Sequence, residues 1–270
     1  MALRKAAVAG RFYPSNVQTL KADLDQYLSP PQTKIKARGI LVPHAGYMYS
    51  GHVAGAVFSR VEIPCRIIIL SPNHTGMGAP LSIMSSGQWE IPLGKVEIDA
   101  DLCKQLMRHC HLLTEDAEAH KFEHSLEVQL PFIHYLKAEA RFVPITVGAS
   151  GFATLERLGR AIADTVRELE EDVLVVASSD MNHYEADAIT RDKDHQAIER
   201  ILALDPKGLY ETVKSQSISM CGYGPTIAML FGIQTAGVLK AELIKYATSG
   251  EINQDMKEVV GYAGIAIYQE

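Results

Sequence analysis

The chain has 270 residues and a formal net charge of −6, from 26 Lys and Arg against 32 Asp and Glu. Hydrophobic residues make up 47% of it and charged residues 21%, which is typical of a folded globular protein and excludes disorder as the main state. A net acidic chain without a block of consecutive Lys or Arg also lacks the positive surface of a general nucleic-acid binder, so we expect no nucleic-acid partner.

No apolar run approaches the roughly 18–20 residues of a membrane-spanning helix, so we expect no membrane partner. The first residues lack the apolar core of a signal peptide, which predicts a protein that is not exported. Cys65, Cys103, Cys110 and Cys221 form no CxxC pair, and this favours a reduced, cytoplasmic setting. We expect the first three of these cysteines to pack in the core.

The chain begins with a helical pattern around Leu20 and Leu24, followed by a proline-containing loop at residues 29–36. Beyond the loop, short apolar runs rich in β-branched residues alternate with helical patterns. In chain order, the predicted elements are strand 39–42, helix 51–61, strand 66–70, short strands between 81 and 98, helix 99–110, helix 125–136, strand 141–147, helix 152–169, strand 172–176, helices 191–204, 205–214 and 224–239, and strands 241–246 and 259–268. This alternation predicts one α/β domain over residues 1–270, with a central, mostly parallel to mixed β-sheet flanked by helices.

Three of the predicted strands run into loops that carry a histidine. His44, His74 and His183 each follow a fully apolar strand, after a short stretch that contains a small residue or a proline. In open α/β sheets, ligands bind in the crevice beyond the carboxyl ends of the strands. If the three strands are parallel neighbours, the three imidazoles converge in that crevice.

Imidazole is the commonest transition-metal ligand and also the commonest general base near neutral pH. His44 and His74 are therefore the expected metal ligands, and Cys221, in a glycine-rich turn that can open a helix, is the best candidate for a third. His183 is expected to be the catalytic acid or base. Asp180, three residues before it, is expected to orient a ligand or a base.

Each of these residues also has a structural explanation. A lone histidine is usually a hydrogen-bonded structural residue, and only the matched placement at strand ends favours function for His44 and His74. Taken alone, Cys221 is better explained as a small, buried hydrophobic residue.

A second group of acids and histidines lies at the start of a predicted helix. Glu123 and Glu127 are four residues apart and would share a helix face, so a His/Glu metal site is an alternative to helix capping. Capping is the better explanation for the two acids, whereas His124 can equally line the crevice as a substrate-binding residue. Tyr47 and Tyr184, close to the strand-end histidines, can contact substrate or simply pack.

Motifs for nucleotide binding and for a serine nucleophile are absent from the chain. No GxGxxG opens a helix after a strand, and neither GxxxxGK[ST] nor GxSxG occurs. We therefore expect no nucleotide cofactor, and a single transition-metal ion at the strand ends is the cofactor that the residues favour.

Several short motifs, taken in order and spacing, resemble the Memo family. They are Gly10-Arg11-Phe12-Tyr13-Pro14, Pro43-His44-Ala45-Gly46-Tyr47, Ser71-Pro72-Asn73-His74, Glu123-His124-Ser125-x-Glu127, Ser178-Ser179-Asp180-Met181-Asn182-His183 and Cys221-Gly222. The resemblance extends over essentially the whole chain. It implies a fold similar to the class III extradiol ring-cleavage dioxygenases and, by family association, a radical-SAM partner protein.

Those dioxygenases hold non-haem Fe(II) with two His and one Glu and use a further His as acid or base. Matched motif by motif, the resemblance implies that His44 and His74 are ligands, that Cys221 stands in place of the carboxylate, and that His183 is the acid/base residue. A thiolate in that place disfavours ring cleavage and softens the site toward copper or zinc, while iron still suits it.

Three functions are consistent with these residues. The first is a metal-dependent oxidoreductase that uses iron or copper on a small molecule. The second is a non-catalytic module that binds a peptide in the same crevice. The third is a zinc-type hydrolase, in which two histidines and a cysteine leave one position open for water. The resemblance favours the first.

Overall fold

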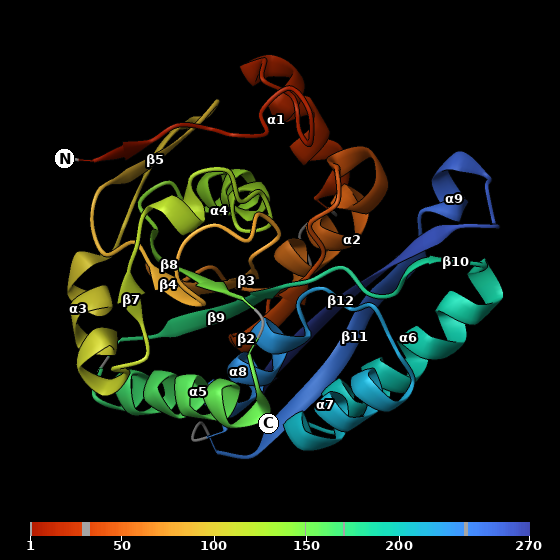
Figure 1. Cartoon of the computed structure of the whole chain (residues 1–270). Helices are drawn as coiled ribbons and strands as arrows, with labels where there is room; N and C mark the ends of the chain where they lie inside the picture. Colours follow the sequence, from red (N-terminus) through yellow and green to blue (C-terminus); the bar gives the residue numbers. More distant parts are fainter. Residues whose placement is uncertain (1, 29–32, 149, 170, 235–236) are drawn as a thin grey trace.

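The computed structural model describes residues 2–28, 33–148, 150–169, 171–234 and 237–270 (Figure 1). The strands are β1 (Leu3–Arg4), β2 (Ala37–Val42), β3 (Arg66–Pro72), β4 (Leu81–Ile83), β5 (Gln88–Ile91), β6 (Gly94–Glu97), β7 (Thr114–Glu115), β8 (Arg141–Val147), β9 (Val173–Ser178), β10 (His183–Glu185), β11 (Leu239–Thr248) and β12 (Val259–Gln269). The helices are α1 (Val17–Tyr27), α2 (Tyr47–Arg60), α3 (Ala100–His109), α4 (Leu130–Leu136), α5 (Phe152–Arg167), α6 (Asp187–Leu202), α7 (Pro206–Ser215), α8 (Tyr223–Ile233) and α9 (Gly250–Asn253), with 3-10 turns η1 (Glu118–His120) and η2 (Glu127–Gln129).

The described strands form one nine-stranded sheet and one three-stranded sheet. The centre of the large sheet is the parallel run β2-β9-β3-β8. Antiparallel pairs flank it, β12 with β2, β11 with β12 and β4 with β8, and the short strand β7 then pairs parallel with β4. The central strands are continuous apolar runs because both of their faces are buried. This topology confirms the predicted α/β fold with a mixed sheet, and it is consistent with a dioxygenase-like fold.

Helices cover both faces of the large sheet. In Figure 1, α5, α7 and α8 lie below it and α1, α2 and α4 lie above it. Gly39 on β2 faces Met229 and Ile233 of α8, whereas Gly264 on β12 faces Val53 and Val57 of α2. The core therefore consists of two layers, one on each side of the same strands.

Three helix starts differ from the prediction by four or five residues, and one of them is α6, which begins at Asp187 rather than at residue 191. Helix α2 begins at Tyr47 rather than at residue 51, directly after Gly46, so the helix starts only three residues after His44. Residues 123–126 are not helical, since Glu123 accepts hydrogen bonds from the backbone N–H and hydroxyl of Ser125 and fixes a turn there. The prediction that Glu123 and Glu127 share a helix face is therefore wrong.

Other sequence-based expectations concern single residues and loops. Cys103 and Cys110 are buried as expected, but Cys65 is exposed, because it lies in the loop before β3. Of the predicted loop at 29–36, residues 29–32 lie outside the described residues, as do residues 235–236 of the predicted helix 224–239.

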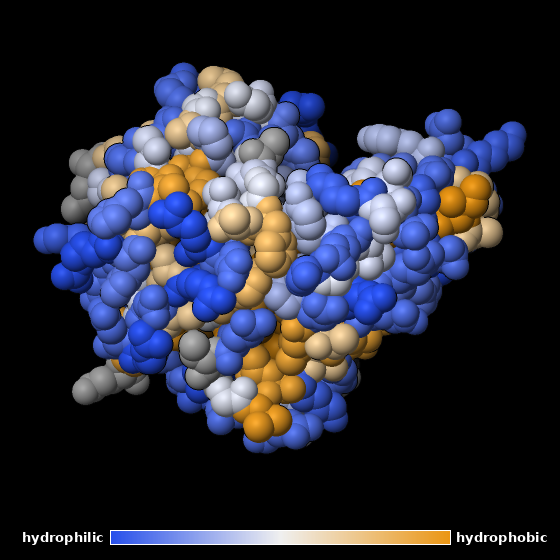
Figure 2. Space-filling view, turned by 60° about the horizontal axis from the view of Figure 1, so that its bottom comes forward, coloured by the Kyte–Doolittle hydropathy of each residue, from blue (hydrophilic) through white to orange (hydrophobic). Residues whose placement is uncertain are grey.

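The surface seen in Figure 2 is mostly hydrophilic, with hydrophobic residues gathered in its lower middle and at the projecting right-hand end. Within the described part of the chain, no helix is both long and apolar enough to cross a membrane.

Candidate metal centre

The carboxyl ends of three parallel strands meet at one edge of the sheet. The register pairs Val42 of β2 with Ser178 of β9, and Leu70 of β3 with Ala177 of β9, so the strands end almost level. His44 and His74 each follow their strand by two residues. The level strand ends therefore bring the two imidazoles to one place, as the strand-end pattern predicted.

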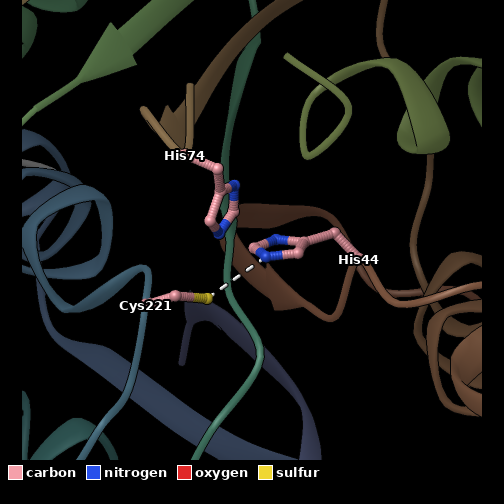
Figure 3. A group of neighbouring side chains, drawn as sticks. All are labelled: His44, His74 and Cys221. Carbon is pink, nitrogen blue, oxygen red and sulfur yellow. Dashed lines mark hydrogen bonds between the residues drawn. The ribbon is translucent and has the colours of Figure 1, made fainter. Parts of the chain in front are cut away.

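Cys221 reaches the same place from the turn before α8 (Figure 3). One ligand atom from each of His44, His74 and Cys221 lies within 4.8 Å of the others. The Cys221 Sγ is 3.2 Å from His44 Nε2, and the two imidazole centroids are 5.1 Å apart. Two imidazole nitrogens and one sulfur at this spacing can hold a single transition-metal ion.

The ring of His44 is oriented by Ser178. The Ser178 hydroxyl donates to the carbonyl of Ser125 at 2.6 Å, so it can only accept from His44 Nδ1, at 3.0 Å. The proton of His44 is thereby placed on Nδ1, and Nε2 keeps its lone pair for a metal. Burial lowers the pKa of His44 well below its usual value, which keeps the imidazole neutral as a ligand must be.

Glu123 orients the ring of His74 in the same way, through a hydrogen bond to its Nδ1. Glu123 accepts from the His74 backbone N–H at 2.6 Å and from His74 Nδ1 at 2.9 Å. Burial on its own would raise the pKa of Glu123, but hydrogen bonds from His74 and Ser125 lower that pKa to about 2. The carboxylate therefore holds His74 with Nε2 free, in the carboxylate–histidine arrangement that supports metal ligands.

Cys221 is held against the strand ends by the glycine that follows it. A Cβ at Gly222 would lie 2.4 Å from the carbonyl oxygen of Ser178, so only glycine allows this close approach. Burial, with a smaller contribution from Asp180, raises the pKa of the Cys221 thiol. The S–H can then donate to His44 Nε2, and a metal ion would take the place of that proton.

His183 lies in the same crevice, beside the group of three. Its Nδ1 donates to the carbonyl of Ser219 at 3.0 Å, and its backbone N–H donates to the Ser219 hydroxyl at 2.7 Å. Burial lowers the pKa of His183, so its Nε2 is available to accept a proton.

Asp180 acts on the backbone of His44 and not on the ring of His183. Its Oδ1 accepts from the backbone N–H of His44 at 2.7 Å and from that of Ala45 at 3.3 Å. Burial raises the pKa of Asp180 to about 6 against the opposing effect of these hydrogen bonds. The predicted orienting role thus falls on a candidate ligand, His44.

The crevice around these residues has a volume of about 650 Å³. His124 lies in it, with its ring stacked on His74 at 4.8 Å between centroids and tilted against Phe12 at 4.5 Å. Tyr184 stands at its rim, 73% exposed and with a positive φ of 60°, a conformation that bulky residues rarely adopt outside special sites.

Tyr47 is not among the crevice residues. It is 3% exposed, its hydroxyl donates to the carbonyl of Val128 at 2.7 Å, and its ring packs against Phe132. Of the two alternatives for Tyr47, contact with substrate or packing, these contacts favour packing: it is the first residue of α2, and its side chain is buried.

Sequence reasoning missed four residues that line the crevice: Phe12, Ser219, Val260 and Tyr262. Phe12 lies in one of the motifs that carried the family resemblance, so a signal for it existed. Ser219 lies two residues before Cys221, beside the glycine-rich turn, whereas Val260 and Tyr262 lie in β12, where no pattern marks them and only the folded arrangement brings them here.

The acidic residues near His124 are buried partners rather than helix caps. His74, Glu123 and His124 also offer ligand atoms within 4.8 Å of one another. Both oxygens of Glu123, however, already accept hydrogen bonds from His74 and Ser125, which makes Glu123 a support for His74 rather than a separate cation ligand. Glu127 binds Arg4 and the hydroxyl of Tyr13.

Comparison with known proteins gives one consistent family. The family model described as "Memo-like protein" matches residues 4–266. A MEMO1 family protein of Pyrobaculum arsenaticum is 43% identical over 281 residues, covering 100% of both chains. Another, from Methanopyrus kandleri, is 41% identical and covers 97% of this chain and 98% of its own.

A solved structure supports the fold. The crystal structure of an uncharacterized protein from Escherichia coli K12 aligns with a TM-score of 0.55 and 12% identity, over 87% of this chain and 100% of that one. At this identity the likeness concerns the fold alone.

Proposed function

The chain belongs to the Memo family, and from that premise we propose that it is a metal-dependent oxidoreductase whose iron or copper ion is held by His44, His74 and Cys221. One observation carries the proposal. Both histidines are hydrogen-bonded through Nδ1, to Ser178 and Glu123, so that each keeps Nε2 free, and the group of three has ligand atoms within 4.8 Å of one another, with His44 Nε2 at 3.2 Å from the sulfur. Purely structural histidines have no need of such matched orientation.

The donor set favours redox metals. A thiolate with two imidazoles suits copper, and it also suits iron or zinc. Three protein ligands leave at least one position for a substrate or a small ligand. When bound, the ion would supply electron transfer to or from a molecule in the crevice.

The chain's own residues would position that molecule and move its protons. A small organic substrate in the 650 Å³ crevice would lie beside His183, whose Nε2 can take a proton from it. His124 and Phe12 offer aromatic rings for contact with the molecule, and Tyr184 lies at the rim. Asp180 holds the backbone of His44 and Glu123 holds the ring of His74, each by a hydrogen bond.

The test is metal content together with the redox behaviour of the bound ion. Wild-type protein purified without oxygen should hold about one iron or copper ion per chain, and His44→Ala and Cys221→Ser should lose most of it. His183→Ala is the matched control, because it changes a crevice histidine that is no candidate ligand, and it should keep its metal.

Electron paramagnetic resonance should follow reversible reduction and oxidation of the ion in wild-type protein. A protein that holds only zinc would instead favour a hydrolase. Equal metal content in wild-type protein and in both ligand variants would overturn the proposed site.

A further inference from the structure

A second cavity lies behind the candidate metal ligands. It has a volume of about 200 Å³ and is formed by the ends of β3 and β8, the start of α8, and Leu155 of α5. Among the described residues that line it, only His74 and Cys221 also line the 650 Å³ crevice. These two side chains therefore form the partition between the main crevice and this second space, which we call the back cavity.

The back cavity offers no charge for an ionic ligand. Its walls include the apolar side chains of Val147, Leu155 and Pro225, and His74 is the one titratable imidazole among the described lining residues, which include no acid, lysine or arginine. Of its polar side chains, that of Tyr223 is already engaged, since its Oη accepts from Lys214 Nζ at 3.0 Å.

Asn73 is similarly occupied. Its Nδ2 donates to the carbonyl of Met77 at 2.8 Å, and its Oδ1 accepts from Thr75 and Gly76. An ion placed in such surroundings would lose its hydration without compensation. One water takes up about 30 Å³ of liquid, so the space suits a molecule of a few heavy atoms.

We propose that the back cavity is a separate binding site for a small uncharged molecule, which reaches the metal centre from the side opposite the main crevice. The proposal rests on the proposed metal site at His74 and Cys221. His183, His124 and Asp180 line the main crevice and not the back cavity. Proton transfer therefore takes place in the main crevice. A second, small reactant in the back cavity can approach the ion without displacing the larger substrate.

Gly224 is the position at which the back cavity can be narrowed with least disturbance. A Cβ there would lie 3.3 Å from Leu155 and 3.4 Å from Val147, and so would stand between the two walls. Gly224 lies in α8, where alanine is favoured over glycine. Ser150→Leu fills the cavity from a different wall. Gly151→Ala is the matched control, since a Cβ there meets nothing within 4 Å.

The experiment uses the metal-free protein, so that it does not depend on metal binding. Mass spectrometry of the Cys221 peptide follows its reaction with methyl methanethiosulfonate, which is small and neutral, and with dithiobis-nitrobenzoate, a bulky aromatic dianion. Gly224→Ala and Ser150→Leu should each slow the small reagent by up to about twofold, because one of two comparable routes to the sulfur is narrowed. The bulky reagent, restricted to the main crevice, should keep its wild-type rate, and Gly151→Ala should change neither.

Unchanged rates with the small reagent in both cavity variants would overturn the proposal, as would equal slowing of both reagents. A chain that binds no metal but shows the expected difference in rates would refute the proposed function and leave the back cavity as a site.

Discussion

At the scale of single residues, Glu123 decides how well His74 can bind a metal. It is buried and ionised, and it fixes the His74 proton on Nδ1. Glu123→Gln keeps the shape but removes the charge, which should weaken metal affinity about 10- to 100-fold without unfolding the protein. Competition with a chromophoric chelator measures the affinity.

A matched glutamate is available as the control. Glu168 contacts His109 Nε2 at 3.1 Å, far from the strand ends and largely exposed. Glu168→Gln should leave metal affinity unchanged. Wild-type affinity in Glu123→Gln would mean that the His74–Glu123 pair is structural and does not tune the ligand.

At the scale of elements, the approach of α2 to the sheet depends on a glycine in β12. A Cβ at Gly264 would lie 2.5 Å from Cγ2 of Val57 and 3.2 Å from Cγ1 of Val53. Gly264→Ala should therefore push α2 away and lower the free energy of unfolding by about 1–3 kcal/mol. Urea denaturation measures this loss. Gly151→Ala has open space at its Cβ, and an equal loss in that variant would contradict the packing argument.

The elements also explain how far sequence reasoning reached. Strand β8 has the predicted bounds, since its apolar run is buried on both faces and signals its length directly. The meeting of His44 and His74 was predictable because parallel strands end at one edge. The role of Glu123 was not, because its hydrogen bonds depend on a non-helical turn. The pattern also left the packing of Tyr47 open, because α2 begins four residues earlier than that pattern suggests.

At the scale of the whole molecule, a buried carboxyl makes folding stability depend on pH. Asp194 on α6 accepts from the backbone N–H of Asn182 after β9 and from the hydroxyl of Tyr246 on β11, so it joins three segments. Burial raises the pKa of Asp194 from 3.8 to about 7, against the opposing effects of these hydrogen bonds, His195 and Arg191. Between these two pH values the folded chain binds a proton that the unfolded chain releases.

The contribution of Asp194 to stability is therefore fully present below pH 3.8 and is lost as the pH rises through about 7. Asp194→Asn stays neutral, and its amide can still accept from Asn182 and donate to Tyr246. Relative to wild type, the variant's free energy of unfolding should rise by at most about 1.4 kcal/mol per pH unit across this window, and the difference should level off above it.

Denaturation at a series of pH values measures the difference in free energy of unfolding between variant and wild type, in which the titration of the histidines cancels. Asp192→Asn, an exposed neighbour on α6, should keep the wild-type profile. A constant difference between Asp194→Asn and wild type from pH 4 to 8 would show that Asp194 is already ionised throughout that range.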